Sequence, residues 1–101
     1  MNPESNTLDI SVSFYAQLRR IVGEKSHIFS LPAGSSVRQL LDAIVLIYPE
    51  LQAQLLDEDG ALYGHIRLLL NGHDLMHHPE QVDTLLRPGD QVSLFPAIGG
   101  G

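Results

Sequence analysis

The last eleven residues of the chain are Gln91-Val92-Ser93-Leu94-Phe95-Pro96-Ala97-Ile98-Gly99-Gly100-Gly101, and they join a strand pattern to a run of glycines. Polar and apolar residues alternate up to Leu94, and Pro96 ends the pattern. Glycine lacks a Cβ and accepts many backbone conformations, so the run forms a thin tail. We expect this tail to project from the domain, so that the α-carboxylate of Gly101 reacts inside a narrow channel of a partner protein.

Three segments before this stretch also have strand patterns. Strict alternation predicts a strand with one buried face over Leu8–Tyr15. Further strands are expected over Ser26–Leu31 and His65–Leu70. Asn71-Gly72 is typical of a type I′ hairpin turn because both residues tolerate positive φ, and a short returning strand is expected around residues 73–76.

One long helix is expected between the second and third strands. Ser36 and Gln39 have the spacing of a capping box, which predicts a helix that begins at Val37, and Pro49 ends it. Helical spacing places a set of apolar side chains on one stripe: Val37, Leu40, Leu41, Ile44 and Tyr48. Three more apolar residues are expected to widen that stripe: Val45, Leu46 and Ile47.

The order strand, strand, helix, hairpin, strand predicts an α+β fold of the β-grasp, or ubiquitin-like, class. In this arrangement a mixed sheet of four to five strands is covered by one main helix, and the last strand lies parallel to the first at its centre. We expect residues 8–96 to form the domain. Residues 1–7 are expected to be a disordered leader, and residues 97–101 a flexible tail.

Composition narrows the function classes. The 101 residues carry a formal net charge of −6, which disfavours nucleic acid as a partner. No apolar run approaches the roughly 18 residues that cross a membrane, and no secretory signal pattern is visible, so we expect a soluble protein of the cytoplasm. The chain has no cysteine, so any sulfur chemistry must use sulfur from elsewhere.

Two familiar kinds of site are disfavoured. His73, His77 and His78 invite a metal interpretation, but adjacent histidines on an extended loop point apart and no carboxylate spacing completes a site. A solvated loop is the better interpretation, and we expect no metal. Nothing in the sequence places a nucleophile, a base and an orienting group together, so no hydrolytic triad is expected.

The residues around the tail are candidates for partner binding. Alternation turns Phe95 to the open face of the sheet, where Leu69 of the neighbouring strand also points. Pro96 and Ile98 lie on either side of the point where the tail begins. An exposed aromatic with a flanking leucine is a plausible anchor for a partner. The alternative is that Phe95 folds over the sheet edge and completes the core, and for the glycines the alternative is a frayed end without function.

Several short motifs together resemble the MoaD/ThiS sulfur carriers. They are Gly34-Ser35-Ser36-Val37 at the helix start, Leu70-Asn71-Gly72 in the hairpin, residues 86–92 (Leu-Arg-Pro-Gly-Asp-Gln-Val), and the ending Phe95–Gly101. The resemblance covers nearly the whole chain from Leu8. Where many relatives have alanine before the final diglycine, this chain has Gly99. Additional residues around 49–64 make it more similar to the small subunits of molybdopterin synthase and to the longer carriers of amino-acid biosynthesis than to thiamine-type carriers.

The resemblance implies that the protein is a cosubstrate of other enzymes. An E1-like partner that uses ATP and Mg²⁺ would adenylate the Gly101 carboxylate, and a donor such as a cysteine desulfurase or a rhodanese would supply sulfur to form a thiocarboxylate. Gly99 and Gly100 would thread the partner's channel, and no cofactor would be bound by the chain itself. The favoured acceptor is the large subunit of a molybdopterin synthase.

Three alternatives remain open on the sequence. The first is a carrier that serves cysteine, methionine or thiamine-type biosynthesis instead. In another class of function, a lysine of a second protein attacks the activated Gly101 carboxyl, and the chain is a ubiquitin-like modifier. The third alternative is a binding module whose tail never reacts.

Overall fold

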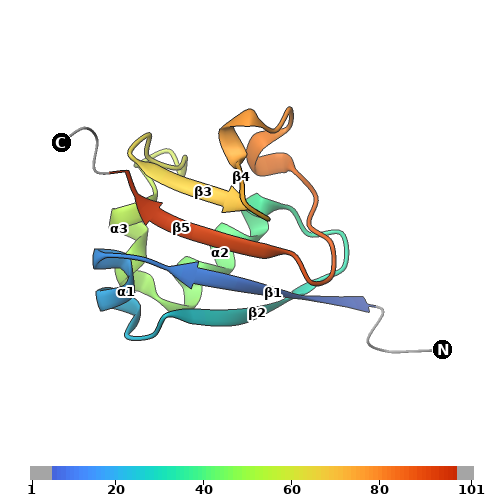
Figure 1. Cartoon of the computed structure of the whole chain (residues 1–101), viewed down its shortest axis with the longest axis horizontal. Coiled ribbons are helices and arrows are strands. Elements are labelled where there is room, and N and C mark those ends of the chain that lie inside the picture. The colour runs from blue at the N-terminus through green and yellow to red at the C-terminus, as the bar shows by residue number, and fades with distance from the viewer. Residues whose placement is uncertain (1–5, 98–101) are drawn as a thin grey trace.

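The computed structural model describes residues 6–97, which form a five-stranded sheet with helices packed on one face (Figure 1). The strands are β1 (Thr7–Phe14), β2 (Ser26–Pro32), β3 (Ile66–Leu70), β4 (His73–Asp74) and β5 (Gln91–Pro96). Their order in the sheet is β2-β1-β5-β3-β4. β5 pairs parallel with β1 and antiparallel with β3, so the last strand lies at the centre. This is the expected β-grasp arrangement.

Helical segments cover the inner face of the sheet. The main helix α2 (Val37–Ile47) is accompanied by α1 (Gln17–Val22) and α3 (Gln52–Leu55). The described residues also form short 3₁₀ turns: η2 (Pro49–Leu51), η3 (Leu75–His77) and η4 (Gln81–Asp83). In residues 6–97 no helix combines the length and the apolar composition that a membrane crossing requires.

The buried core lies between α2 and the sheet. The four side chains expected to face inward from β1 are all buried: Leu8, Ile10, Val12 and Phe14. From α2 the buried residues are Val37, Leu40, Leu41 and Ile44. Every second residue of β3 and β5 joins them: Ile66, Leu68, Leu70, Val92 and Leu94. Burial of this apolar surface is the main stabilising term of the fold.

Local signals in the sequence formed the expected structures. The capping box is present, with the Gln39 backbone N–H bonded to Ser36 Oγ and the Ser36 N–H bonded to Gln39 Oε1 at 2.8 Å. Asn71 and Gly72 have φ values of 52° and 86°, as a type I′ turn requires. The Asn71 side chain also accepts the Gln91 N–H at 2.9 Å and donates to Asp90 at 3.0 Å. The hairpin is therefore tied to the start of β5.

Four expectations were wrong in detail. Thr7, assigned to the leader, belongs to β1 and pairs with Pro32. Tyr15, assigned to the first strand, lies in the turn after it. The returning strand β4 is only two residues long, because Leu75–His77 coil into η3. Leu46 and Ile47 do not widen the buried stripe of α2: they are 81% and 50% exposed. At about 100° per residue, Leu46 points to the side of the helix opposite the core, and Ile47 lies on its flank.

Candidate functional site

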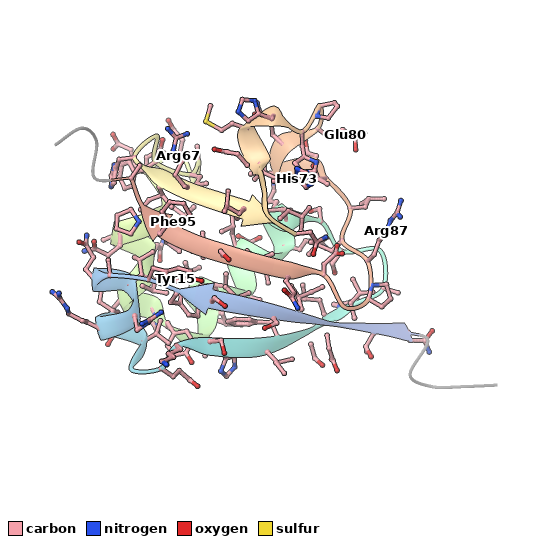
Figure 2. The ribbon with its side chains drawn as sticks, viewed as in Figure 1. Tyr15, Arg67, His73, Glu80, Arg87 and Phe95 are labelled. Carbon is pink, nitrogen blue, oxygen red and sulfur yellow. The ribbon has the colours of Figure 1, made fainter. Side chains whose placement is uncertain are left out.

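A shallow hollow opens on the uncovered face of the sheet, where β1 and β5 end. It is lined by Tyr15, Ala16, Leu69, Ser93, Phe95 and Pro96, and we call it the tail-proximal hollow. Figure 2 shows Tyr15 and Phe95 close together at this end of the sheet. Because β1 and β5 are parallel neighbours, both strands deliver their last residues to the same place.

Phe95 lies on the open face, as alternation along β5 predicted. The buried neighbour Leu94 points to the core, and Phe95 is half-buried outside that core. Its ring meets Tyr15 edge-to-face, with 6.2 Å between the ring centroids. Leu69 is opposite Ser93 in the β3–β5 register. Ser93 and Phe95 are two residues apart on β5, so Leu69 is a diagonal neighbour of Phe95 on the same face. The alternative in which Phe95 completes the core is not what the structure shows.

Tyr15, Ala16 and Arg19 are parts of this surface that the sequence analysis did not assign to it. Tyr15 is 41% exposed, and the guanidinium of Arg19 lies 5.2 Å from the centroid of its ring, a cation–π distance. Arg19 is held there by a hydrogen bond from Nε to the Phe14 carbonyl at 2.9 Å. The outward position of Tyr15 in the alternating stretch was a usable signal, but its contact with Phe95 depends on strand pairing.

The backbone beyond β5 is attached to the start of β3. Pro96 is opposite Ile66, and the Ala97 N–H donates to the His65 carbonyl at 2.6 Å. The chain thus passes the tail-proximal hollow in a defined position up to Ala97. Ile98, Gly99, Gly100 and Gly101, which the sequence singled out for partner binding and for reaction, lie outside the described residues.

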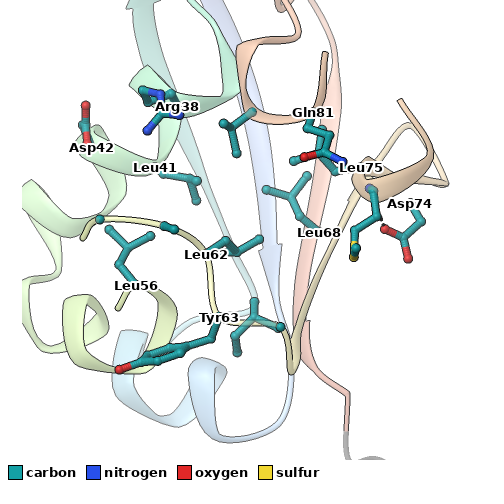
Figure 3. A pocket seen from close by; sticks show the side chains of 16 residues that line it. Arg38, Leu41, Asp42, Leu56, Leu62, Tyr63, Leu68, Asp74, Leu75 and Gln81 are labelled. Atoms are coloured by element: carbon teal, nitrogen blue, oxygen red, sulfur yellow. Dashed lines mark hydrogen bonds between the residues drawn. The ribbon is translucent and has the colours of Figure 1, made fainter. Parts of the chain in front are cut away.

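A second cavity, of about 360 Å³, lies on the helix-covered side of the sheet (Figure 3). Its walls are mainly apolar, with Leu41 from α2, Leu68 from β3 and Leu62 from the loop before β3. Arg38 and Asp42 stand at the α2 side of this cavity. Because Leu68 points to the inner face and Leu69 to the outer one, the sheet separates this cavity from the tail-proximal hollow.

The three loop histidines do not assemble into a metal site. His73 is in β4 and His77 in η3, and both are exposed. Within residues 6–97, no three side chains of the His, Cys, Asp or Glu type gather closely enough to hold a metal ion.

Comparison with known proteins places the chain in a family. The model of the ThiS family matches residues 12–101. Small archaeal modifier protein 3 of Haloferax volcanii is 32% identical over 94 residues, which cover 93% of this chain and 100% of that protein. A putative sulfur carrier protein of Archaeoglobus fulgidus is 32% identical over 66 residues, covering 65% of this chain and 74% of that protein.

A solved structure agrees with the sequence matches. The crystal structure of SAMP1 from Haloferax volcanii superposes with a TM-score of 0.81 at 28% sequence identity, and the match covers 92% of this chain and 99% of that one. The family match includes all of β5 and continues through the glycine tail. This chain therefore belongs to the ThiS family of ubiquitin-like sulfur carriers and modifiers.

Proposed function

We propose that the chain is a sulfur carrier whose Gly101 carboxylate is activated by a partner enzyme and turned into a thiocarboxylate. The observation that supports this most directly is the attachment of Ala97 beside an aromatic hollow at the end of the central strand. The glycine tail follows Ala97 in the sequence, so a partner that binds the tail-proximal hollow is also close to the tail. The relative described as a putative sulfur carrier protein supports the same chemistry.

The reaction proceeds in two steps on the partner. The Gly101 carboxylate attacks the α-phosphorus of ATP, a C–O–P linkage forms, and pyrophosphate leaves with Mg²⁺. In the second step, the terminal sulfur of a persulfide on a donor such as a cysteine desulfurase or a rhodanese attacks the acyl carbon, and the C–S bond forms as the bond to AMP breaks. This leaves an acyl disulfide with the donor, and a cellular thiol reduces its S–S bond to release the thiocarboxylate. Free hydrosulfide gives the thiocarboxylate directly when AMP leaves, with release of one proton. Because this chain has no cysteine, the sulfur nucleophile has to come from the donor.

The favoured acceptor is a molybdopterin-synthase-like large subunit, which would use the thiocarboxylate to build a dithiolene. The chain's contribution is positioning: Tyr15 and Phe95 are aromatic anchors of the kind that dominate protein interfaces. Positioning a reactive group converts an encounter between two proteins into an effectively intramolecular reaction, which is a large part of the rate gain.

An intact-mass measurement tests the proposal. The full chain is incubated with the E1-like enzyme of the same organism, ATP, Mg²⁺ and a sulfide source. The expected result is the replacement of one oxygen by one sulfur at the C-terminus. Deletion of Gly101, or addition of one residue after it, should abolish the change while the unfolding curve stays the same. Sulfuration of the deletion variant would contradict the mechanism.

The role of the tail-proximal hollow is tested separately by Phe95→Ala. The substitution should weaken binding of the E1-like enzyme, since one of the two aromatic rings is lost. Leu85→Ala is the matched control, because Leu85 is 62% exposed and lies outside the hollow. Affinity is measured by titration calorimetry. Equal affinity of the two variants would remove Phe95 from the interface.

A second function, as a protein modifier, is favoured by the 32% identity to small archaeal modifier protein 3. In that case a partner lysine attacks the acyl adenylate or a thioester derived from it, and an isopeptide bond forms. Mass spectrometry of cell extracts should then find Gly101 joined to lysines. Lys25 is the only lysine of this chain, so Lys25→Arg separates adducts with other proteins from adducts between copies. Extracts with thiocarboxylate and no adducts would leave only the carrier function.

A further inference from the structure

One edge of the sheet is long and uncovered. β2 is the outermost strand on its side, with seven residues, whereas the opposite edge strand β4 has two (Figure 1). A strand edge presents backbone N–H and C=O groups that can pair with another chain, and natural proteins usually protect such edges. The β2 edge is therefore the stronger candidate for an interaction.

The hydrogen-bond pattern shows which residues of β2 face outward. The Phe14 N–H donates to the Lys25 carbonyl at 2.8 Å, and in an antiparallel ladder every second residue repeats this pairing. The backbone N–H and C=O groups of His27, Phe29 and Leu31 therefore also face β1. The N–H groups of Ser11 and Tyr15 point instead to the other side of β1, toward Asp90 and Leu94. The backbone groups that face away from the sheet consequently belong to three residues: Ser26, Ile28 and Ser30.

The usual protective features are absent from this edge. The β1–β2 register runs without a bulge through seven residue pairs. The segment Ser26–Pro32 contains no Asp, Glu, Lys or Arg, and its proline is at the last position. In the part of the chain that the structure describes, no hydrogen bond outside the β1–β2 ladder engages the outward N–H or C=O groups. Ile28 is 64% exposed in the middle of this segment.

We propose that β2 pairs antiparallel with β2 of a second copy of this chain, about a two-fold axis at Ile28. In that register Ile28 is opposite Ile28 of the second copy, and Ser26 is opposite Ser30 of the second copy. All three outward N–H groups and all three outward C=O groups find partners, because an antiparallel hydrogen-bonded pair exchanges both bonds. The two isoleucine side chains meet on the open face, and the result is one continuous sheet.

The edge is self-complementary in chemistry as well as in register. Ser26 and Ser30 each lie two residues from the central Ile28, so the pattern is the same in both directions along the strand. No charged side chain of β2 is brought opposite a like charge, although each copy carries a net charge of −6. The long-range repulsion between copies is screened by salt, so the dimer should be tighter at high ionic strength.

The helix beneath the edge adds apolar surface. The Tyr48 hydroxyl lies 3.2 Å from His27 Nδ1, which places the end of α2 over β2. At about 100° per residue, Ile47 falls on the flank of α2 opposite to Arg38 and Asp42, which line the cavity beside β3. Ile47 is 50% exposed on that flank, so it would face the added strand. The tail-proximal hollow, at the ends of β1 and β5, stays open in the dimer.

Sedimentation velocity of the full chain tests the proposal across a series of protein and salt concentrations. The wild type should shift from monomer to dimer as protein concentration rises, and the midpoint should move to lower concentration in high salt. Ile28→Lys places two like charges directly opposite each other and should stay monomeric. Leu85→Lys is the matched control, since it adds the same charge at an exposed leucine away from β2, and it should dimerise as the wild type does.

Two further measurements make the result decisive. Ser30→Pro removes an outward N–H that the monomer does not use, so it should also prevent dimerisation; circular dichroism of each variant checks that the fold is retained. In the wild type, amide exchange at Ser26, Ile28 and Ser30 should slow as concentration rises. A wild type that remains monomeric throughout, or a folded Ile28→Lys variant that dimerises, would overturn the proposal. Neither result bears on the chemistry of Gly101.

Discussion

Ala16 has a backbone conformation that residues with a side chain rarely adopt, with φ 55° and ψ −134°. It lies between β1 and α1, where the Leu18 N–H closes a turn onto the Tyr15 carbonyl at 3.1 Å. Tyr15 and Ala16 of this turn both line the tail-proximal hollow, where the Tyr15 ring meets Phe95. Unusual backbone conformations of this kind concentrate at functional sites.

Replacement of Ala16 by glycine should stabilise the protein. Relief of the backbone strain is worth about 1–3 kcal/mol, and the added flexibility of the unfolded chain costs about 0.5–1 kcal/mol, so we expect a net gain of about 1 kcal/mol. Ala53→Gly in α3, which has ordinary helical geometry, should instead lose about 1 kcal/mol. Urea unfolding measures both free energies. A loss of stability in Ala16→Gly would show that the turn is not strained.

At the scale of elements, α2 is defined by the contacts at its two ends. Ser36 and Gln39 form the capping box at its beginning, and Tyr48 follows its last turn. The Tyr48 hydroxyl donates to Glu24 Oε2 at 2.8 Å and also lies close to His27 Nδ1. Tyr48 therefore joins the end of α2 to the β1–β2 hairpin, two segments that are far apart in the sequence.

Removal of the capping serine should shorten the stable part of α2. Ser36→Ala leaves the Gln39 N–H without its side-chain acceptor, and such changes cost about 1 kcal/mol. Ser36→Asp restores an acceptor and should recover most of that loss. Thermal unfolding followed at a helix-sensitive wavelength is the measurement. An unfolding free energy of Ser36→Ala equal to that of the wild type would mean that the cap contributes nothing.

Tyr48 predicts a loss of stability in alkali. Burial and the hydrogen bond to Glu24 raise the pKa of Tyr48 to about 12, from 10.0 in the absence of these effects. The unfolded chain therefore loses this proton at lower pH than the folded chain does. The stabilisation is complete below about pH 10, decreases as the pH rises from there, and is lost by about pH 12. Tyr48→Phe has no proton to lose at this position, so its stability should decline less over the same interval.

At low pH, the hydrogen bond between Tyr48 and Glu24 affects stability through the ionisation of the Glu24 carboxyl group. The hydrogen bond from Tyr48 is the main reason why the pKa of Glu24 is lowered, and this effect outweighs the opposing effect of burial. Because the pKa of Glu24 is lowered in the folded chain, the stabilisation is present above about pH 4.5. It is lost as the pH falls through the folded-state pKa of Glu24. Unfolding curves at several pH values, with Tyr48→Phe beside the wild type, measure both effects. Parallel pH profiles would contradict the assignment.

At the scale of the whole molecule, the central strand carries both stability and function. β5 contributes the fully buried Leu94 to the core and the half-buried Phe95 to the tail-proximal hollow. Consecutive side chains on one strand point to opposite faces, so these two roles are separate at the level of single substitutions. A domain of this size has only about 5–15 kcal/mol of net stability, and one large loss can unfold it.

Leu94→Ala should therefore destabilise the fold strongly. Truncation of a fully buried leucine costs about 2–5 kcal/mol because it leaves a cavity. Leu46→Ala is the control: the side chain is 81% exposed despite its place in an apolar run, and its effect should stay within about 0.5 kcal/mol. Both are measured by urea unfolding. A comparable loss in the two variants would show that Leu46 is buried in solution, for example against a partner.

Much of the fold could be predicted from neighbouring residues alone. Strand patterns in the sequence identified β1, β2, β3 and β5, the capping box gave the first residue of α2, and Asn71-Gly72 gave the hairpin turn. The placement of Leu69 and Phe95 on the open face followed from the same period of two. Leu46 and Ile47 were misplaced, because the rotation of about 100° per residue turns Leu46 away from the core and Ile47 to the flank of the helix, even though both belong to an apolar run.

By itself, then, the sequence determined the local elements, their order and the composition of the glycine tail, because caps, turns and alternation act between residues close together along the chain. Only the tertiary structure decided that Tyr15 and Phe95 meet, that Ala97 is attached to the start of β3, and that β2 has a free edge. Each of these depends on which strands become neighbours. That choice is made by burial of the whole core between α2 and the sheet, a property of the folded chain and of no single segment.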